Sequence, residues 1–145
     1  MGITTAMCTS FKSELLGGTH DLDTHTIKLA LIKASPSGTY NAATTNYSDV
    51  TGNSDEASGT NYPVTGQVLD SVSISTSGTT AIVDIADEVF STVTVSADGC
   101  IIYNSSASNK AIAVIDFGGT KTSTSGNFTI QFPAADASNA IIRIA

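Results

Sequence analysis

The spacing of hydrophobic positions changes near residue 20. Before this point apolar residues recur every four positions, which is the spacing of one face of a helix. The recurring residues are Met7, Phe11 and Leu15, with Cys8 beside them. Thr4 or Thr5 can cap the start of such a helix, and Gly17-Gly18 can end it in a left-handed conformation. The pattern predicts a helix over about residues 4–16 that packs its apolar side on the rest of the protein.

After residue 24 the period becomes two, and β-branched residues dominate. Apolar and polar side chains alternate, as in strands with one buried face, in residues 27–31, 68–75 and 128–132. Two stretches are apolar on both faces and resemble central strands, 100–103 and 111–117. Further short strands are expected near 81–85, 92–95 and 139–144. Gly, Ser and Asn turns separate the strands. The pattern predicts a mainly β fold, an antiparallel β-sandwich or flattened barrel of about seven to nine strands with one N-terminal α-helix packed on it.

The segment from residue 34 to 66 has almost no aliphatic periodicity. It is rich in Ser, Thr, Asn and Gly, and Tyr40, Tyr47 and Tyr62 lie among these small residues. A loop of this length inside a domain is usually functional or disordered, and tyrosines among small polar residues are typical of recognition surfaces. Two interpretations follow. The three tyrosines contact another protein subunit, or the loop folds back on its own sandwich and the tyrosines form a satellite of the core.

Composition limits the partners. The length of 145 residues predicts one domain, residues 1–145, and 6 Lys and Arg against 13 Asp and Glu give a net charge of -7. Such a surface is repelled by phosphate, so neither a nucleic-acid nor a membrane partner is expected. No stretch reaches the roughly 18 apolar residues of a membrane span, and no secretory signal is visible at the N-terminus. We therefore expect cytoplasmic synthesis, with Cys8 and Cys100 as free, buried thiols.

The stretch HDLDTHT contains four side chains that can bind a divalent metal, His20, Asp21, Asp23 and His25. In an extended segment the last three would share one face and His20 would point to the other. A single ion would then need a sharp turn. We interpret the stretch as a solvated connector between helix and sheet, and predict no metal and no cofactor.

The phrase AVIDFGGTKT, residues 113–122, resembles the phosphate-binding turn of sugar kinases in the actin-like ATPase superfamily. Those kinases close a second lobe over the nucleotide, and this chain has no room for one after the phrase. A Walker loop is excluded because Thr120, not glycine, precedes Lys121. There is also no Gly-x-Ser-x-Gly elbow. We predict no catalytic residues and no enzymatic activity.

We interpret the same phrase as a β-hairpin. Phe117 would end one strand, Gly118 and Gly119 would supply the positive φ of a turn, and Phe128 would begin the partner strand. Asp116 lies between apolar neighbours. It is expected to face solvent at a strand end or to accept hydrogen bonds from the turn.

Four stretches together resemble a family of small virion structural proteins of tailed phages, common among marine ones: TTAMCTSFKSELLGGTH, TIKLAL, IIYNSSASNKAIAVIDFGG and FTIQFPAADASNAIIRIA. The similarity is weakest over residues 34–66. The resemblance implies a capsid decoration or cement protein that forms a homo-oligomer and binds the major capsid protein on the outer surface of the virion. Negative charge favours that surface over the DNA-facing one. Two alternatives stay open, a tail, connector or fibre-associated virion protein and a carbohydrate-binding β-sandwich on the virion.

Overall fold

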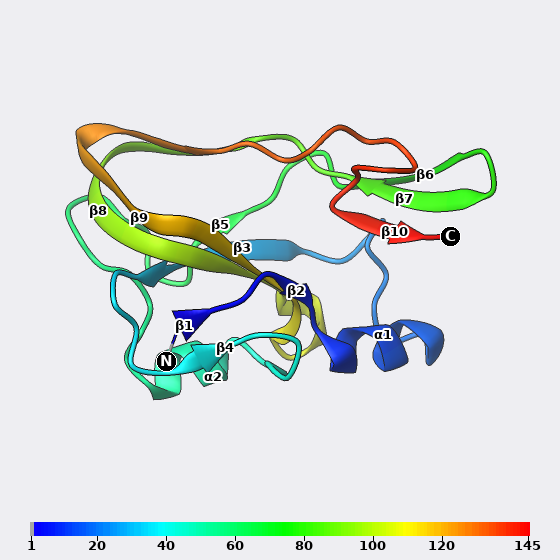
Figure 1. Ribbon diagram of the computed structural model, residues 1–145, viewed down its shortest axis with the longest axis horizontal. Coiled ribbons are helices and arrows are strands. Elements are labelled where there is room, and N and C mark those ends of the chain that lie inside the picture. The colour runs from blue at the N-terminus through cyan, green and yellow to red at the C-terminus, as the bar shows by residue number, and fades with distance from the viewer. Residues whose placement is uncertain (1) are drawn as a thin grey trace.

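The computed structural model describes residues 2–145, and its centre is a five-stranded antiparallel sheet of order β2-β9-β8-β3-β5 (Figure 1). These strands are β2 (Ala6–Met7), β9 (Lys110–Ile130), β8 (Glu88–Asn104), β3 (Ile27–Lys33) and β5 (Gln67–Val68). A second antiparallel sheet has the order β10-β7-β6 and contains β10 (Ile142–Ile144), β7 (Thr80–Asp84) and β6 (Ser73–Ser77). A parallel pair joins β1 (Gly2–Ile3) to β4 (Thr39–Tyr40). The predicted mainly β, antiparallel fold with a sandwich-like arrangement is confirmed.

The first helix begins later than the spacing predicted. α1 spans Thr9–Leu16 and has Cys8, not a threonine, at its N-cap. The preceding residues pair instead with β9, so that Met7 lies opposite Ala113 on a strand. The predicted helix start is wrong because Ala6 and Met7 form a strand that pairs with β9. A short helix α2 (Ser48–Gly52) and a 3-10 turn η1 (Ser105–Ala107) were not predicted.

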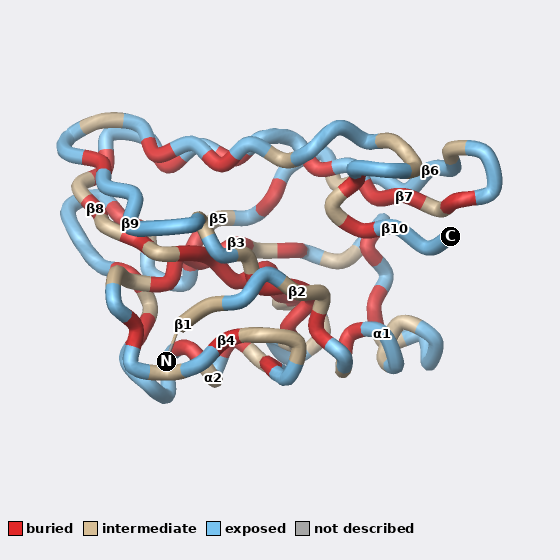
Figure 2. The backbone as a smooth tube through the Cα atoms, viewed as in Figure 1, coloured by how far each residue is buried: buried red, intermediate tan, exposed pale blue. Residues whose placement is uncertain are grey.

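The core lies where the central sheet is covered on both faces. Figure 2 shows the buried positions concentrated in β3 and in the adjoining parts of β8 and β9. The predicted central stretch 100–103 is buried on both faces, but of the predicted stretch 111–117 only residues 111–114 are buried, and residues 115–117 are half-buried or exposed. β3 is also buried on both faces from Leu29 to Ile32, although its sequence predicted one exposed face. The largest fully buried side chains are Tyr40, Tyr103, Phe11, Phe90, Leu29, Leu31, Ile32, Ile101, Ile102, Ile112, Val50 and Val93.

β8 and β9 form one long ribbon that bends back over the sheet (Figure 1). Pairing runs from Asn104 opposite Lys110 to Glu88 opposite Ile130. Its largest irregularity lies where Ala97 pairs with Lys121 and Gly99 pairs with Asp116, so that residues 117–120 oppose the single residue 98. A bulge of this kind bends the strand that carries it. It divides the ribbon into a near half in the central sheet and a far half above it.

The hairpin predicted at Gly118-Gly119 is therefore wrong. Both glycines have positive φ, 73° and 135°, but they form the bulge within β9 and not a turn between strands. Pairing with β8 continues on both sides of the bulge, and Phe117 and Phe128 lie on the same strand with ring centroids 5.9 Å apart. Asp116 behaves as expected, because it is exposed and its carboxylate accepts a 2.9 Å hydrogen bond from the Gly118 amide.

The long polar segment lies along the edge of β3 that faces away from β8, beyond the short pairing with β5. The Lys33 amide donates to the Asp55 carbonyl and the Ala57 amide to the Leu31 carbonyl, both at 2.8 Å. Gly66 then crosses this edge with φ +78°, and a Cβ there would lie 2.7 Å from the Ala30 Cα and still closer to the neighbouring carbonyl. The segment is packed against the sheet by its backbone.

We predict that Gly66→Ala destabilises the protein more than Gly78→Ala. Both glycines are left-handed, and an alanine there costs about 1–2 kcal/mol. A Cβ at Gly78 meets nothing within 4 Å, whereas the clash at Gly66 adds about 1–3 kcal/mol. Urea unfolding of the two variants measures the difference. Equal losses would show that the approach to β3 is not tight.

Candidate functional site

The three tyrosines singled out in the sequence converge on two adjacent carboxylates. Tyr40 donates a hydrogen bond to Asp55, and Tyr47 and Tyr62 both donate to Glu56. All three tyrosines are buried. The polar loop is thus folded around a network inside the protein.

Asp55 is fully buried and its carboxylate accepts four hydrogen bonds from three residues. The Tyr40 hydroxyl lies at 2.6 Å, the Gly38 amide at 2.8 Å, and the Ser37 amide and hydroxyl at 3.0 Å. Lys33 adds an ion pair with an N–O distance of 3.0 Å. Burial alone would raise the pKa of Asp55, but these hydrogen bonds outweigh it and hold the pKa well below its ordinary value. The carboxylate is charged at neutral pH.

Glu56 binds the other two tyrosines and the loop backbone. One carboxylate oxygen accepts from the Tyr62 hydroxyl at 3.0 Å and from the Thr65 amide at 2.8 Å, and the other accepts from Tyr47. Burial and the neighbouring carboxylate raise the pKa of both tyrosines. Their hydroxyls therefore stay protonated and donate at all physiological pH values.

Ring stacking connects this network to the ribbon. Tyr47 stacks on Tyr103 of β8 with centroids 4.5 Å apart, and Tyr62 stacks on Phe90 at 5.6 Å. The rings are part of the main core cluster. Of the two interpretations of residues 34–66, the loop that folds back with its tyrosines in the core describes the structure. The interpretation of Tyr40, Tyr47 and Tyr62 as contacts to another subunit does not fit this arrangement. Their rings are buried, and their hydroxyls donate to Asp55 and Glu56 of the same chain.

The histidine-rich connector is fastened to the end of β8 by Asn104. The fully buried Asn104 amide nitrogen lies 3.0 Å from His20 Nδ1 and 2.9 Å from His25 Nδ1. His20 Nε2 lies 3.1 Å from a Glu14 oxygen. Of the remaining candidate ligands, His25 is half-buried and Asp21 and Asp23 are exposed, and Asp21 accepts from the Asp23 amide in a local turn. The prediction of a solvated connector is thus correct for Asp21 and Asp23 and wrong for His20, which is buried.

These side chains do not converge on a common point. Within residues 2–145, no group of three or more His, Cys, Asp or Glu side chains is arranged to hold a metal ion. Cys8 and Cys100 are free and buried, as predicted. Burial raises the pKa of the Cys8 thiol to about 11 and that of Cys100 further, so both stay protonated at neutral pH.

The three-stranded sheet presents an apolar face that is only partly covered. Ile74, Val83 and Ile142 lie side by side in its register, and Ala81 pairs with Ile144. Ile74 and Ile144 are each 53% exposed. A groove of about 440 Å³ separates this face from α1 and the connector, and it is lined by Leu15, His20, Asp21, Leu22, Ile74, Ala81, Ile82, Val83, Ile142 and Ile144. The face is an apolar surface in contact with solvent.

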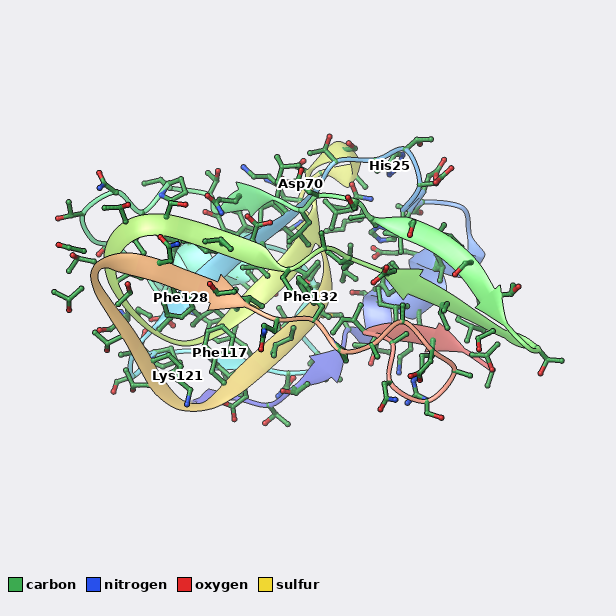
Figure 3. The ribbon with its side chains drawn as sticks, turned by 90° about the horizontal axis from the view of Figure 1, so that it is seen from above. His25, Asp70, Phe117, Lys121, Phe128 and Phe132 are labelled. Atoms are coloured by element: carbon green, nitrogen blue, oxygen red, sulfur yellow. The ribbon has the colours of Figure 1, made fainter. Side chains whose placement is uncertain are left out.

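One edge of that sheet is open. β6 pairs with β7 alone, and its sequence SISTS contains no charge and no proline. The pairing is regular, without a bulge. Figure 3 shows the hairpin of β6 and β7 extending beyond the rest of the fold. Lysines, prolines and bulges are the usual devices that prevent an edge from pairing with another chain, and β6 has none of them.

No family model, no curated protein and no solved structure matches this chain. In the part of the chain that the structure describes, no helix is long and apolar enough to cross a membrane.

The sequence pointed to the tyrosines but not to their partners. Asp55 and Glu56 stand in the run GNSDEASG, where acidic residues usually face solvent. A signal was present, since a carboxylate pair lies between three tyrosines in a segment with no other acidic residue except Asp49. The β10-β7-β6 face was missed because β10 is distant in the sequence from the hairpin of β6 and β7.

We predict that Asp55→Asn lowers the free energy of unfolding at pH 7 by about 2–4 kcal/mol, because it removes the charge from a buried hydrogen-bond network. The folded pKa is depressed, so this stability is present above the ordinary carboxyl pKa of 3.8 and is lost as the pH falls below it. Chemical unfolding at pH 7, 4 and 2.5 should show a steeper decline for the parent protein than for the variant.

Tyr40→Phe is the milder companion variant. It keeps the charge and removes one hydrogen bond, which is worth about 1.5–3 kcal/mol when the acceptor is charged. Parallel pH curves for the parent and Asp55→Asn, or no loss in Tyr40→Phe, would contradict the assigned network.

Proposed function

We propose that this protein is a bacteriophage virion structural protein, a capsid decoration or cement protein that binds the outer surface of the major capsid shell as a homo-oligomer. The observation that carries the proposal is the β10-β7-β6 sheet, whose apolar face is exposed at Ile74 and Ile144 and whose edge strand β6 is open and uncharged. An exposed apolar face beside an unprotected strand edge is typical of a surface that binds another protein. The resemblance to tailed-phage virion proteins supplies the identity of that partner.

Two further properties support this role. Decoration proteins remain exposed on the particle, and a long polar loop tied down by buried hydrogen bonds leaves little for proteases to cut. The net charge of -7 suits the outside of a shell, because the inside holds packaged phosphate. The uncharged β6 lets copies of an acidic chain approach each other where repulsion is least.

Counting copies in purified virions tests the proposal. A decoration protein is present in many copies spread over the head, which quantitative mass spectrometry against the major capsid protein and labelled-antibody electron microscopy both measure. A few copies at one vertex or on the tail would reject decoration in favour of a tail, connector or fibre-associated part.

We predict that Ile74→Lys weakens binding to purified shells about tenfold or more. The substitution places a charge on the exposed apolar face, and losing the burial of a large aliphatic side chain costs about 1.5–3 kcal/mol. Because Ile74 is 53% exposed, the variant should still fold. Co-sedimentation of protein with shells measures the change.

Val64→Lys is the matched control, since Val64 is 76% exposed but lies in the polar loop outside the three-stranded sheet. It should bind shells like the parent. Equal binding by all three proteins would exclude the β10-β7-β6 face as the contact surface.

A further inference from the structure

A second hollow lies between the two halves of the bent β8–β9 ribbon, away from the three-stranded sheet (Figure 3). Its volume is about 410 Å³, within the roughly 300–1,000 Å³ of small-molecule sites. The lining residues of most importance are Ile115, Phe117, Lys121, Phe128, Ile130 and Phe132. All of them belong to β9 or to the residues directly after it. The hollow exists because the bulge at residues 117–120 folds the strand back on itself.

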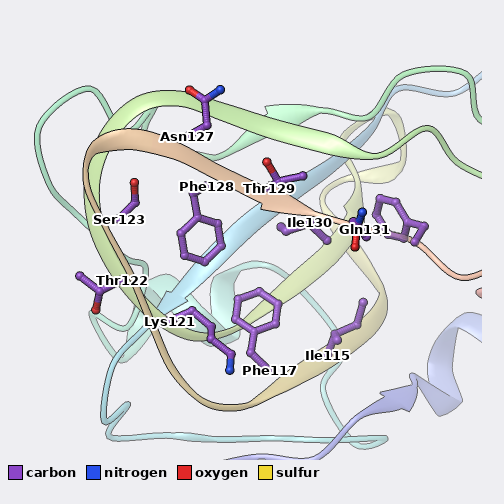
Figure 4. Close-up of a pocket in the computed structure, with 11 residues that line it drawn as sticks. Ile115, Phe117, Lys121, Thr122, Ser123, Asn127, Phe128, Thr129, Ile130 and Gln131 are labelled. Atoms are coloured by element: carbon purple, nitrogen blue, oxygen red, sulfur yellow. The ribbon is translucent and has the colours of Figure 1, made fainter.

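The walls of the hollow are apolar and partly aromatic. The rings of Phe117 and Phe128 enter it from opposite halves of the ribbon (Figure 4), with centroids 5.9 Å apart and planes inclined by 45°. Phe117 and Phe132 are only half-buried, so their rings meet solvent in the hollow. An apolar ligand that covers such a surface removes it from water, which favours binding by about 25 cal/mol per Å² of apolar surface buried.

One cation reaches into this apolar space. Figure 4 shows the Lys121 side chain extending from the bulge toward Phe117. Lys33 and Lys110 each have a carboxylate partner, whereas within residues 2–145 no ion pair involves Lys121. Lys121 is the one charged residue among those that line the hollow. It leaves one positive charge available for a ligand.

We propose that this hollow binds a small amphiphilic carboxylate, with its aliphatic body packed against Phe117 and Phe128 and its carboxylate on Lys121 Nζ. A single cation matches a single negative charge, and the protein's net charge opposes ligands with more. The apolar walls require a body of several carbons, which excludes small polar anions. This site is independent of the proposed virion role, because it lies on the ribbon and not on the β10-β7-β6 face.

Titration of ¹⁵N-labelled protein with sodium octanoate, followed by NMR, tests the site. Amide shifts should be saturable and should cluster at residues 115–117, 121–123 and 127–132. Octanol, which has the same chain without the charge, should bind at least about tenfold more weakly. Absence of saturable shifts, or shifts centred on the groove beside Ile144, would overturn the proposal.

Two variants assign the interaction. Lys121→Gln should weaken octanoate binding at least about tenfold and leave octanol binding unchanged, whereas Lys12→Gln, at an exposed lysine of α1, should change neither. Phe117→Ala should weaken both ligands, with its fold verified by the unchanged dispersion of core amides. Octanoate binding that survives Lys121→Gln would refute the role of the cation.

Discussion

The structure depends on one constraint, the hydrogen bonds that the adjacent carboxylates of Asp55 and Glu56 accept from the polar loop. Residues 55–57 run beside β3, and consecutive side chains of an extended segment leave it on opposite sides. One carboxylate therefore gathers Tyr40 and the backbone of residues 37 and 38, and the other gathers Tyr47 and Tyr62. A buried carboxylate without such partners would cost several kcal/mol. The loop is therefore stable in this conformation only when both carboxylates are buried together with their hydrogen-bond donors.

This constraint decides which surfaces remain for function. With its tyrosines inside, the polar loop is part of the body and not a flexible recognition element. Two apolar surfaces are left in contact with solvent, the face of β10-β7-β6 and the hollow of the bent ribbon. The first adjoins an open strand edge and suits a protein partner. The second contains Lys121, which has no ion pair within residues 2–145, and suits a small anionic ligand. The strand edge and the lysine explain why we assign the two surfaces different partners.

Local patterns in the sequence predicted the local features of the fold. Alternation predicted the longer strands, Phe11 was placed correctly in the core, and Asp116 is exposed and accepts a hydrogen bond from Gly118, although it does not end its strand. Features set by distant contacts were not predictable in this way. Met7 has helical spacing but pairs with Ala113, over a hundred residues away. Gly118-Gly119 has the composition of a turn, and only the continued pairing of β8 makes it a bulge. The tyrosines were recognised as special, but whether they face inward depends on Asp55 and Glu56, whose burial no local pattern signals.

Amide hydrogen exchange on the unmodified protein tests the central claim most directly. The amides of Ser37 and Gly38, bonded to Asp55, and of Thr65, bonded to Glu56, lie in a segment that looks like an exposed loop. If the two carboxylates hold this segment in the core, these amides open only with the cooperative unit of the sheet and exchange nearly as slowly as those of residues 100–103. Exchange within seconds, at the rate of an unstructured loop, would contradict the account.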